Sequence, residues 1–147
     1  GALIMTQYHQ LGMTLPVFAL GSFNSPAFFK VAGAAAEGIH NAEVWGYGVD
    51  NPAAKRFVAA WQAQNKDYPG LYAVSGYVEM QTIIEALKKA GGDDRAKLKA
   101  ALESLSWDSP IGSIRFDENH QARTLMFVTK NKDGLGTVTN TYDTSKD

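Results

Sequence analysis

The stretch PVFALGSFNSPAFF, residues 16–29, begins with the pattern of a buried strand and ends with the pattern of a helix. Residues 16–20 form a short, uniformly apolar run, which is typical of a strand buried on both faces of a parallel sheet. The Ser-Pro pair at 25–26 supplies a capping residue followed by a first-turn proline, a combination that predicts a helix start. Between them lies a polar turn, residues 21–24, with one large aromatic residue, Phe23. Strand, turn and helix in this order indicate an α/β protein.

The composition is that of an ordinary globular domain and excludes several other classes of protein. The chain has 147 residues, of which 45% are hydrophobic and 20% charged, enough for one domain with a sizeable core. The formal net charge is −1, from 14 Lys and Arg against 15 Asp and Glu, so nothing favours a nucleic acid or an anionic membrane surface as partner. No apolar run is long enough to span a bilayer, and the absence of cysteine excludes disulfides and thiol catalysis.

The rest of the chain alternates helix patterns with strand patterns and ends in a run of strands. Further helices are expected at 2–12, 51–64, 72–90 and after the capping residue Asp94, and further strands at 39–45, 113–116, 124–130 and 137–142. The first helix has no strand before it, so we expect the chain to be part of a longer protein. The inner face of the long helix is expected to carry Ala73, Tyr77, Met80, Ile84 and Leu87.

The sequence contains no motif for metal binding, phosphate binding or catalysis. The histidines His9, His40 and His120 stand far apart and in no ligand-spaced pair, so neither a metal nor a cofactor is expected. Asp117 and Glu118 beside His120 could suggest acid–base chemistry, but they fall where a hairpin must turn, and a turn explains them better. No glycine-rich phosphate loop and no GxSxG nucleophile motif is present. We therefore expect no enzymatic activity.

Aromatic and small polar residues stand where the predicted strands end and where the long helix begins. Ligands of open α/β sheets lie beyond the carboxyl ends of strands and at helix amino termini, so these residues are candidates for a binding site. They are Ser22 and Phe23 after the first strand, Trp45 and Tyr47 after the second, and Tyr72 at the start of the long helix. The alternative is that these aromatic side chains only close the rim of the core.

Several segments in a fixed order resemble a known family. They are PVFALGSFNSPAFFKVAGAAAEGI, NPAAKRFVAAW, LYAVSGYVEMQTIIEALKKAGG, DDRAKLKAALESL and SPIGSIRFDENHQAR. Together they resemble the carboxyl-terminal part of the type 1 periplasmic solute-binding proteins, the Leu/Ile/Val-binding-protein-like family of branched-chain amino acid ABC transporters. The resemblance implies an α/β fold, here a truncated portion of two Rossmann-like three-layer lobes joined by a hinge. It places residues 1–48 in the second (carboxyl-terminal) lobe, 49–119 in the first (amino-terminal) lobe, and 120–147 back in the second lobe as a terminal hairpin.

The resemblance also implies a function. The protein would be the periplasmic or extracellular component of a bacterial ABC transporter, with its signal peptide outside this chain. It would capture an amino acid, an amide, or an aromatic or aliphatic carboxylate by hinge closure, and deliver it to the permease without catalysis or cofactor. Two alternatives are a ligand-sensing domain of a receptor or regulator with the same fold, and a hydrolase that uses Ser22. Because half of the cleft would be missing, the isolated chain is expected to bind poorly, to expose apolar surface and to self-associate.

Carried over residue by residue, the ligand loop of the family's second lobe falls on the turn at 21–23. In the amino acid binders this loop often offers an acid that holds the substrate ammonium group, and here it has none. The resemblance therefore favours a carboxylate, an amide or an aromatic acid over an α-amino acid as ligand. The first-lobe position that flanks the ligand with an aromatic residue falls on Tyr72. The complete set of expected ligand-binding residues is Gly21, Ser22, Phe23, Tyr72, Trp45 and Tyr47.

Overall fold

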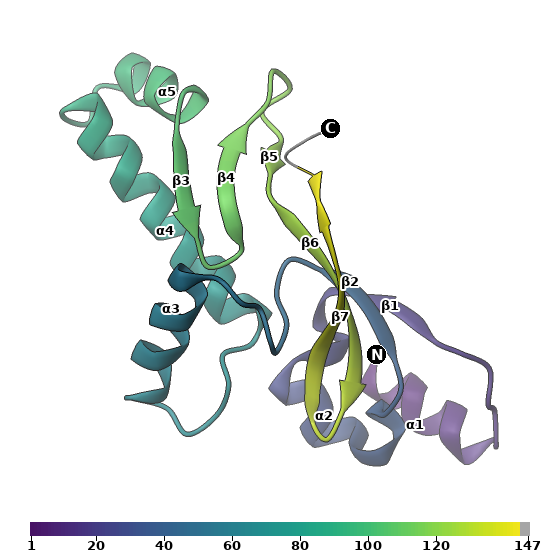
Figure 1. Ribbon diagram of the computed structural model, residues 1–147. Coiled ribbons are helices and arrows are strands. Elements are labelled where there is room, and N and C mark those ends of the chain that lie inside the picture. Colours follow the sequence, from purple (N-terminus) through teal and green to yellow (C-terminus); the bar gives the residue numbers. More distant parts are fainter. Residues whose placement is uncertain (145–147) are drawn as a thin grey trace. The chain divides into compact units, whose positions relative to one another are not determined.

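A computed structural model of the chain describes residues 1–144, which divide into two compact units (Figure 1). Unit 1 combines residues 1–49 with residues 126–142. Unit 2 combines residues 50–125 with residues 143–144. The chain therefore enters unit 2 after Val49 and returns to unit 1 at Met126.

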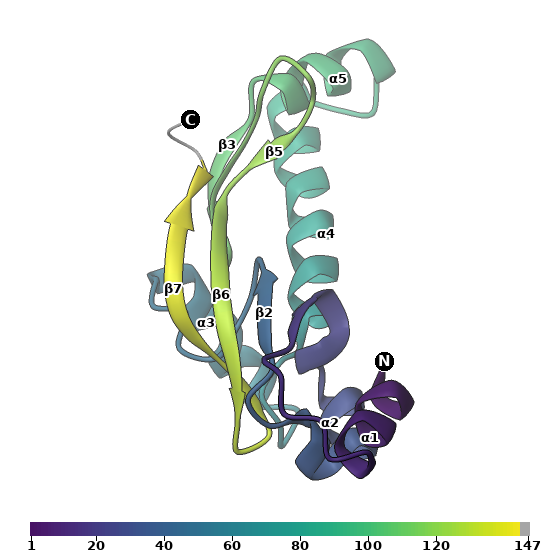
Figure 2. The same cartoon turned by 90° about the vertical axis from the view of Figure 1, so that its right-hand side faces the viewer.

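Unit 1 is a mixed sheet with short helices. Its elements are α1 (Ala2–Gln10), β1 (Phe18–Leu20), the 3-10 turn η1 (Gly21–Asn24), α2 (Pro26–Ala32), the 3-10 turn η2 (Gly33–Ala36), β2 (His40–Glu43), β6 (Leu125–Lys132) and β7 (Leu135–Asp143). The strands lie in the order β1-β2-β6-β7, and Figure 2 shows β2, β6 and β7 side by side. β1 runs parallel to β2, with Phe18 opposite His40, and β6 runs antiparallel to β2. Segments from the two ends of the chain thus share one sheet.

The core of unit 1 lies between the helices and one face of β1. Its buried members are Met5, Phe28, Ala32, Ala36 and Ile39, with Val17 and Ala19 packed against them. The opposite face of β1 is exposed, because Phe18 and Leu20 keep 76% and 74% of their surface accessible. The parallel pairing follows the expectation, but burial of β1 on both faces was wrong, since α1 and α2 cover only the face that carries Val17 and Ala19.

Unit 2 packs helices against a small antiparallel sheet. Its elements are α3 (Pro52–Gln62), α4 (Leu71–Ala90), α5 (Arg95–Glu103), β3 (Ser106–Ser109), β4 (Gly112–Phe116) and β5 (Ala122–Arg123). The strands lie in the order β3-β4-β5. Cap chemistry places the helix starts as expected: the amide of Ala54 donates to Asn51 Oδ1 at 2.8 Å, and the amide of Lys97 donates to Asp94 Oδ1 at 2.9 Å.

The long helix α4 buries a different face from the one that apolar spacing predicts. Its buried residues are Val74, Val78, Thr82 and Ala86, each four positions after the last. The expected inner residues Tyr77, Met80 and Ile84 are exposed, so that expectation was wrong. The face of α4 with the smaller side chains is buried because Ala86 packs with Ala101 of α5 and with Leu105, which follows α5. Thr82 Oγ1 on the same face accepts a hydrogen bond from the Trp107 indole at 3.1 Å.

Two strands of unit 2 have no counterpart among the expected strands. β3 pairs with β4, and the two residues of β5 pair with the end of β4, Arg115 opposite Arg123 and Phe116 opposite Ala122. The polar turn after Phe116 therefore closes a hairpin within unit 2. Residues 120–125 belong to unit 2 together with this hairpin, and the chain passes to unit 1 between Leu125 and Met126.

Candidate functional site: the turn after strand β1

The predicted ligand loop is a single 3-10 turn, η1, between β1 and α2. Gly21 opens it with a φ of +68°, a conformation that side-chain-bearing residues rarely adopt. Ser25 then caps α2, since its Oγ accepts a hydrogen bond from the amide of Phe28 at 3.2 Å. Because β1 and β2 are parallel, η1 lies at the edge of the sheet where β2 also ends, at Glu43. This carboxyl edge is where open α/β sheets place their ligands.

A buried carboxyl group from β2 holds the turn. Asn24 Nδ2 donates a hydrogen bond to Glu43 Oε1, and Thr129 Oγ1 of β6 donates to the same oxygen at 3.0 Å. Glu43 keeps only 4% of its surface accessible, and its second oxygen, Oε2, has no hydrogen-bond partner among the described residues. Gly136 of β7 lies against Asn24 so closely that a Cβ there would stand 2.5 Å from Asn24 Nδ2. A glycine at 136 therefore makes room for the Asn24 side chain.

Burial changes the acidity of this carboxyl group. Loss of hydration raises the pKa of Glu43 from 4.5 to about 7, although the hydrogen bonds from Thr129 and Asn24 act in the opposite direction. Among residues 1–144, no charged group contributes to this pKa. Close to neutral pH, Glu43 is therefore a mixture of the neutral acid and the carboxylate.

A second polar side chain fastens the backbone of the turn. Asn131 Nδ2 of β6 donates to the carbonyl oxygen of Phe23 at 2.8 Å and to that of Ala36 at 3.0 Å. Its Oδ1 accepts a hydrogen bond from Asn41 Nδ2 at 3.0 Å. Asn41 and Asn131 are both buried, so these bonds form away from bulk water, where an unmade bond is costly.

The side chains within the turn have different surroundings. The Phe23 ring packs on Phe28, with the ring centroids 5.0 Å apart, and joins the edge of the unit 1 core. Ser22 uses its carbonyl oxygen to accept the amide of Ser25 at 3.1 Å, whereas its hydroxyl makes no hydrogen bond with any other residue in 1–144. Phe23 thus contributes to the core in addition to any contact with a ligand. The Ser22 hydroxyl is available to bond to a ligand.

The other predicted site residues come from segments of the chain outside the turn. Trp45, two residues after β2, is 2% exposed, while Tyr47 is 46% exposed and joins its backbone to β7. The amide of Tyr47 donates to Gly136 O at 2.8 Å, and the amide of Val138 donates to Tyr47 O at 2.9 Å. Tyr72 is 69% exposed in the first turn of α4 and belongs to unit 2. Of the predicted site residues, η1 itself carries Gly21, Ser22 and Phe23, and Trp45 and Tyr47 belong to the same unit.

Sequence reasoning missed the residues that hold the turn. They are Asn24, Glu43, Thr129 and Asn131. A signal was present, because uncharged and acidic polar residues stand at alternate positions of two strands: 41 and 43 on β2, 129 and 131 on β6. Without the pairing of these strands, this alternation is indistinguishable from a solvent-facing pattern.

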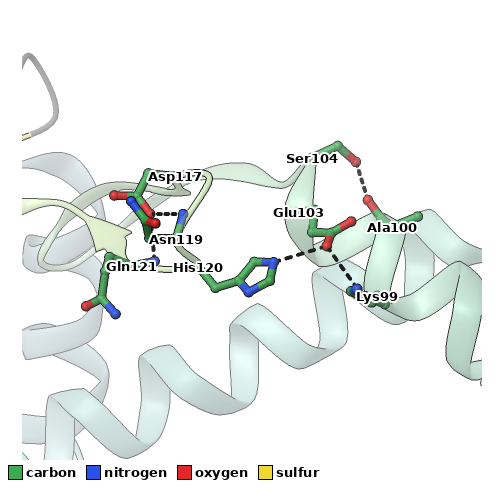
Figure 3. A network of polar contacts seen from close by, with 8 residues as sticks. All are labelled: Lys99, Ala100, Glu103, Ser104, Asp117, Asn119, His120 and Gln121. Carbon is green, nitrogen blue, oxygen red and sulfur yellow. Dashed lines mark hydrogen bonds and ion pairs between the residues drawn. The ribbon is translucent and has the colours of Figure 1, made fainter.

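The polar residues around the β4–β5 hairpin form a separate network in unit 2 (Figure 3). Asp117 Oδ1 accepts the amides of Asn119 and Gln121, both at 2.9 Å, and Asp117 Oδ2 accepts from Arg123 Nε at 3.0 Å. The pKa of Asp117 is lowered, chiefly by the amide of Gln121. This carboxylate is occupied in shaping the turn, as expected, and is not free for acid–base work.

Beside this turn lies a surface hollow of about 220 Å³, lined by Lys99, Leu102, Glu103, Phe116 and His120. Glu103 Oε1 lies 3.1 Å from His120 Nε2 and accepts a hydrogen bond from it when that nitrogen carries a hydrogen, and it lies 3.6 Å from Lys99 Nζ. All three side chains are substantially exposed, and the ion pair between Glu103 and Lys99 therefore contributes little to stability. Within residues 1–144, no cluster of His, Cys, Asp and Glu is arranged to hold a metal ion. No helix in the same range is both long and apolar enough to cross a membrane.

Comparisons with known proteins agree with this architecture. The family model of the periplasmic binding proteins matches residues 1–135. The leucine-, isoleucine-, valine-, threonine- and alanine-binding protein of Pseudomonas aeruginosa is 26% identical over 126 residues, which cover 86% of this chain and 34% of that protein. The crystal structure of the leucine-binding protein LivK from Thermotoga maritima has a TM-score of 0.88 at 26% identity, covering 99% of this chain and 42% of that one.

A solute-binding protein of an ABC transporter from Rhodopseudomonas palustris, solved in complex with benzoate, has a TM-score of 0.86 at 25% identity, covering 98% of this chain and 41% of that one. This chain thus spans about a third of the curated relative and about two fifths of the solved structures. The expected α/β fold, a portion of the type 1 periplasmic-binding-protein fold, is confirmed by these likenesses. The chain belongs to the periplasmic binding protein family, among the type 1 proteins related to the branched-chain amino acid binding proteins.

Proposed function

We propose that this chain forms part of the extracytoplasmic solute-binding component of a bacterial ABC transporter. The observation that carries the proposal is the turn η1, held at the carboxyl edge of a parallel strand pair in a chain of the periplasmic binding protein family. In this proposal unit 1 belongs to the second lobe of the family fold and unit 2 to the first. The complete protein works in the periplasm or outside the cell and hands its ligand to a permease.

The proposed mechanism is binding without catalysis. Closure of the two lobes buries a small ligand, and the ligand shifts the open–closed equilibrium because it gains contacts only in the closed form. Ser22 would offer a directional hydrogen bond, and aromatic side chains such as Phe23 and Tyr72 would offer apolar contact area. A hydrolytic role for Ser22 lacks support, since no hydrogen bond in the described part of the chain joins Ser22 to a histidine.

The proposed ligand is a small carboxylate or amide, with an aromatic acid preferred to an α-amino acid. The turn itself contains no acid for an ammonium group, and the nearest carboxyl group, Glu43, is buried and bonded to Asn24. The benzoate complex of the Rhodopseudomonas palustris relative supports this choice, while the amino acid binders among the relatives support the alternative. The two groups of ligands are separable by a direct binding test.

The test is isothermal titration calorimetry of the complete protein with benzoate, 4-hydroxybenzoate, leucine and isoleucine. We expect saturable binding of an aromatic acid, and we expect Ser22→Ala to weaken it about fivefold, the cost of one hydrogen bond. Ser106→Ala, which removes an exposed serine of unit 2, is the matched control and should leave Kd unchanged. Binding of leucine alone would overturn the ligand class, whereas turnover of a bound ester that is lost in Ser22→Ala would overturn the non-catalytic function.

A further inference from the structure

Two polar contacts fix the turn η1 from strands that are distant in sequence. Asn24 Nδ2 donates to Glu43 Oε1, and this oxygen also accepts Thr129 Oγ1 at 3.0 Å. Asn131 Nδ2 donates to the Phe23 carbonyl at 2.8 Å. The first of these contacts depends on Glu43, which is not among the residues proposed to contact the ligand.

We propose that Glu43 and Asn24 form a buried clamp that sets the position of the turn η1, and that Glu43 is therefore a positioning residue for ligand binding. The second part rests on the proposed function, since it assumes that η1 contacts the ligand. The clamp itself does not depend on that assumption. Its removal should loosen the turn whether or not a ligand binds there.

The geometry separates this role from direct contact with a ligand. Glu43 is 4% exposed, and the Oε2 atom, which makes no bond to any described residue, is itself shielded from solvent. A ligand at the turn would therefore meet Asn24 and its neighbours before it met the carboxyl group. The Asn24 side chain packs between Glu43 and the backbone of β7 at Gly136, which fixes its position.

The clamp needs an acceptor oxygen more than it needs a charge. Both hydrogen bonds end on Oε1, and the three groups that meet there are Asn24 from η1, Thr129 from β6 and Glu43 from β2. Neither of the two donors carries a charge. Glutamine offers the same carbonyl oxygen in a side chain of nearly the same shape, so Glu43→Gln should preserve the clamp. Alanine at 43 removes the acceptor and leaves Thr129 and Asn24 without their partner.

The experiment measures amide hydrogen exchange of the turn in the complete protein that contains this chain. The reporter is the amide of Ser25, which bonds to Ser22 O at 3.1 Å across the turn. We expect Glu43→Ala and Asn24→Ala each to accelerate this exchange about fivefold or more, because each removes a hydrogen bond that holds the turn. Glu43→Gln should leave it within twofold of the wild type. Asn24→Ala serves as the independent variant, because its side chain is less buried than Glu43 and its loss disturbs the fold less.

The control variant is Ser109→Ala, which removes a buried hydroxyl and its 2.6 Å bond to Gly112 O in unit 2. It should destabilise unit 2 and leave the exchange rate of the Ser25 amide unchanged. Unchanged Ser25 exchange in both Asn24→Ala and Glu43→Ala would overturn the clamp. Binding of benzoate and leucine by the Glu43 variants tests the second part. The expected result is a Kd raised about fivefold in Glu43→Ala and unchanged in Glu43→Gln. Accelerated exchange in the variants with an unchanged Kd would overturn the role in binding. Accelerated exchange in the variants, together with a wild type that binds neither compound, would support the clamp and count against the proposed function.

Discussion

The burial of Glu43 predicts a specific pH dependence of stability. In the folded protein the pKa of Glu43 is about 7, compared with 4.5 for the ordinary group, so between these two values the folded state holds a proton that the unfolded state has released. Each step up in pH across this window favours unfolding. At about 1.4 kcal/mol for each pKa unit, the stability lost between pH 4.5 and pH above 7 is about 3 kcal/mol.

Glu43→Gln removes this titration while keeping the shape and the acceptor oxygen. The variant should match the wild type at pH 4.5 and exceed it by about 3 kcal/mol at pH 8, in the free energy of unfolding. The difference between the two proteins isolates Glu43, because every other titrating group is common to both. Urea unfolding at several pH values, followed by tryptophan fluorescence, measures it, and the buried Trp45 reports on unit 1.

The matched control for this comparison is Glu79→Gln, an equal chemical change at an exposed position of α4. As a surface substitution it should change the free energy of unfolding by no more than about 0.5 kcal/mol. The difference in the free energy of unfolding between Glu43→Gln and the wild type should grow from pH 4.5 to pH 8. Growth of less than about 1 kcal/mol would refute the reasoning. It would mean that Glu43 is hydrated, or paired with a charge, in the folded protein.

Three further predictions follow from local geometry. Asn51→Ala should cost about 2 kcal/mol of stability in urea unfolding, because it removes both the cap of α3 and a 2.9 Å bond to a proline carbonyl. Gly112→Ala should cost a similar amount of stability, about 2 kcal/mol, since the φ of Gly112 is +104° and a Cβ would stand 2.7 Å from a leucine side chain. Gly76→Ala, at a position within α4 where a Cβ meets open space, should instead stabilise the protein by up to about 1 kcal/mol. The isolated chain should self-associate through the exposed face of β1, and serine at both Phe18 and Leu20 should raise the monomer fraction in light scattering; an unchanged distribution would exclude that face.

The parts of the fold that sequence predicts well are those with local causes. The starts of α2 and α3 follow from Ser25 and Asn51, because a capping side chain bonds to amides only three residues away. The parallel pairing of β1 and the strand-turn-helix order also follow from a short stretch. By contrast, β5 is only two residues long and is fixed by pairing with β4, so it is too short for a periodic pattern to predict it.

The turn at the candidate site was predictable from sequence as an element of the fold, but the contacts that hold it were not. The turn at 21–23 follows from the order of strand, turn and helix together with the family resemblance. The role of Glu43 does not, because it depends on Thr129, which lies 86 residues further along the chain. The buried face of α4 was missed for a similar reason: Thr82 is bonded by Trp107 of β3 and Ala86 packs with Ala101 of α5, and both partners lie in later segments of the chain.

The bond between Asn131 and the Phe23 carbonyl joins positions 108 residues apart, and this has a consequence for how the protein is made. A ribosome adds roughly 5 to 20 residues each second, so β6 emerges about 5 to 20 seconds after the turn that it fastens. During that interval the nascent turn lacks its partners, and the apolar side chains beside it have no finished sheet to cover them. Chaperones that recognise exposed apolar segments should therefore bind residues 16–29 until β6 and β7 are available to complete the sheet.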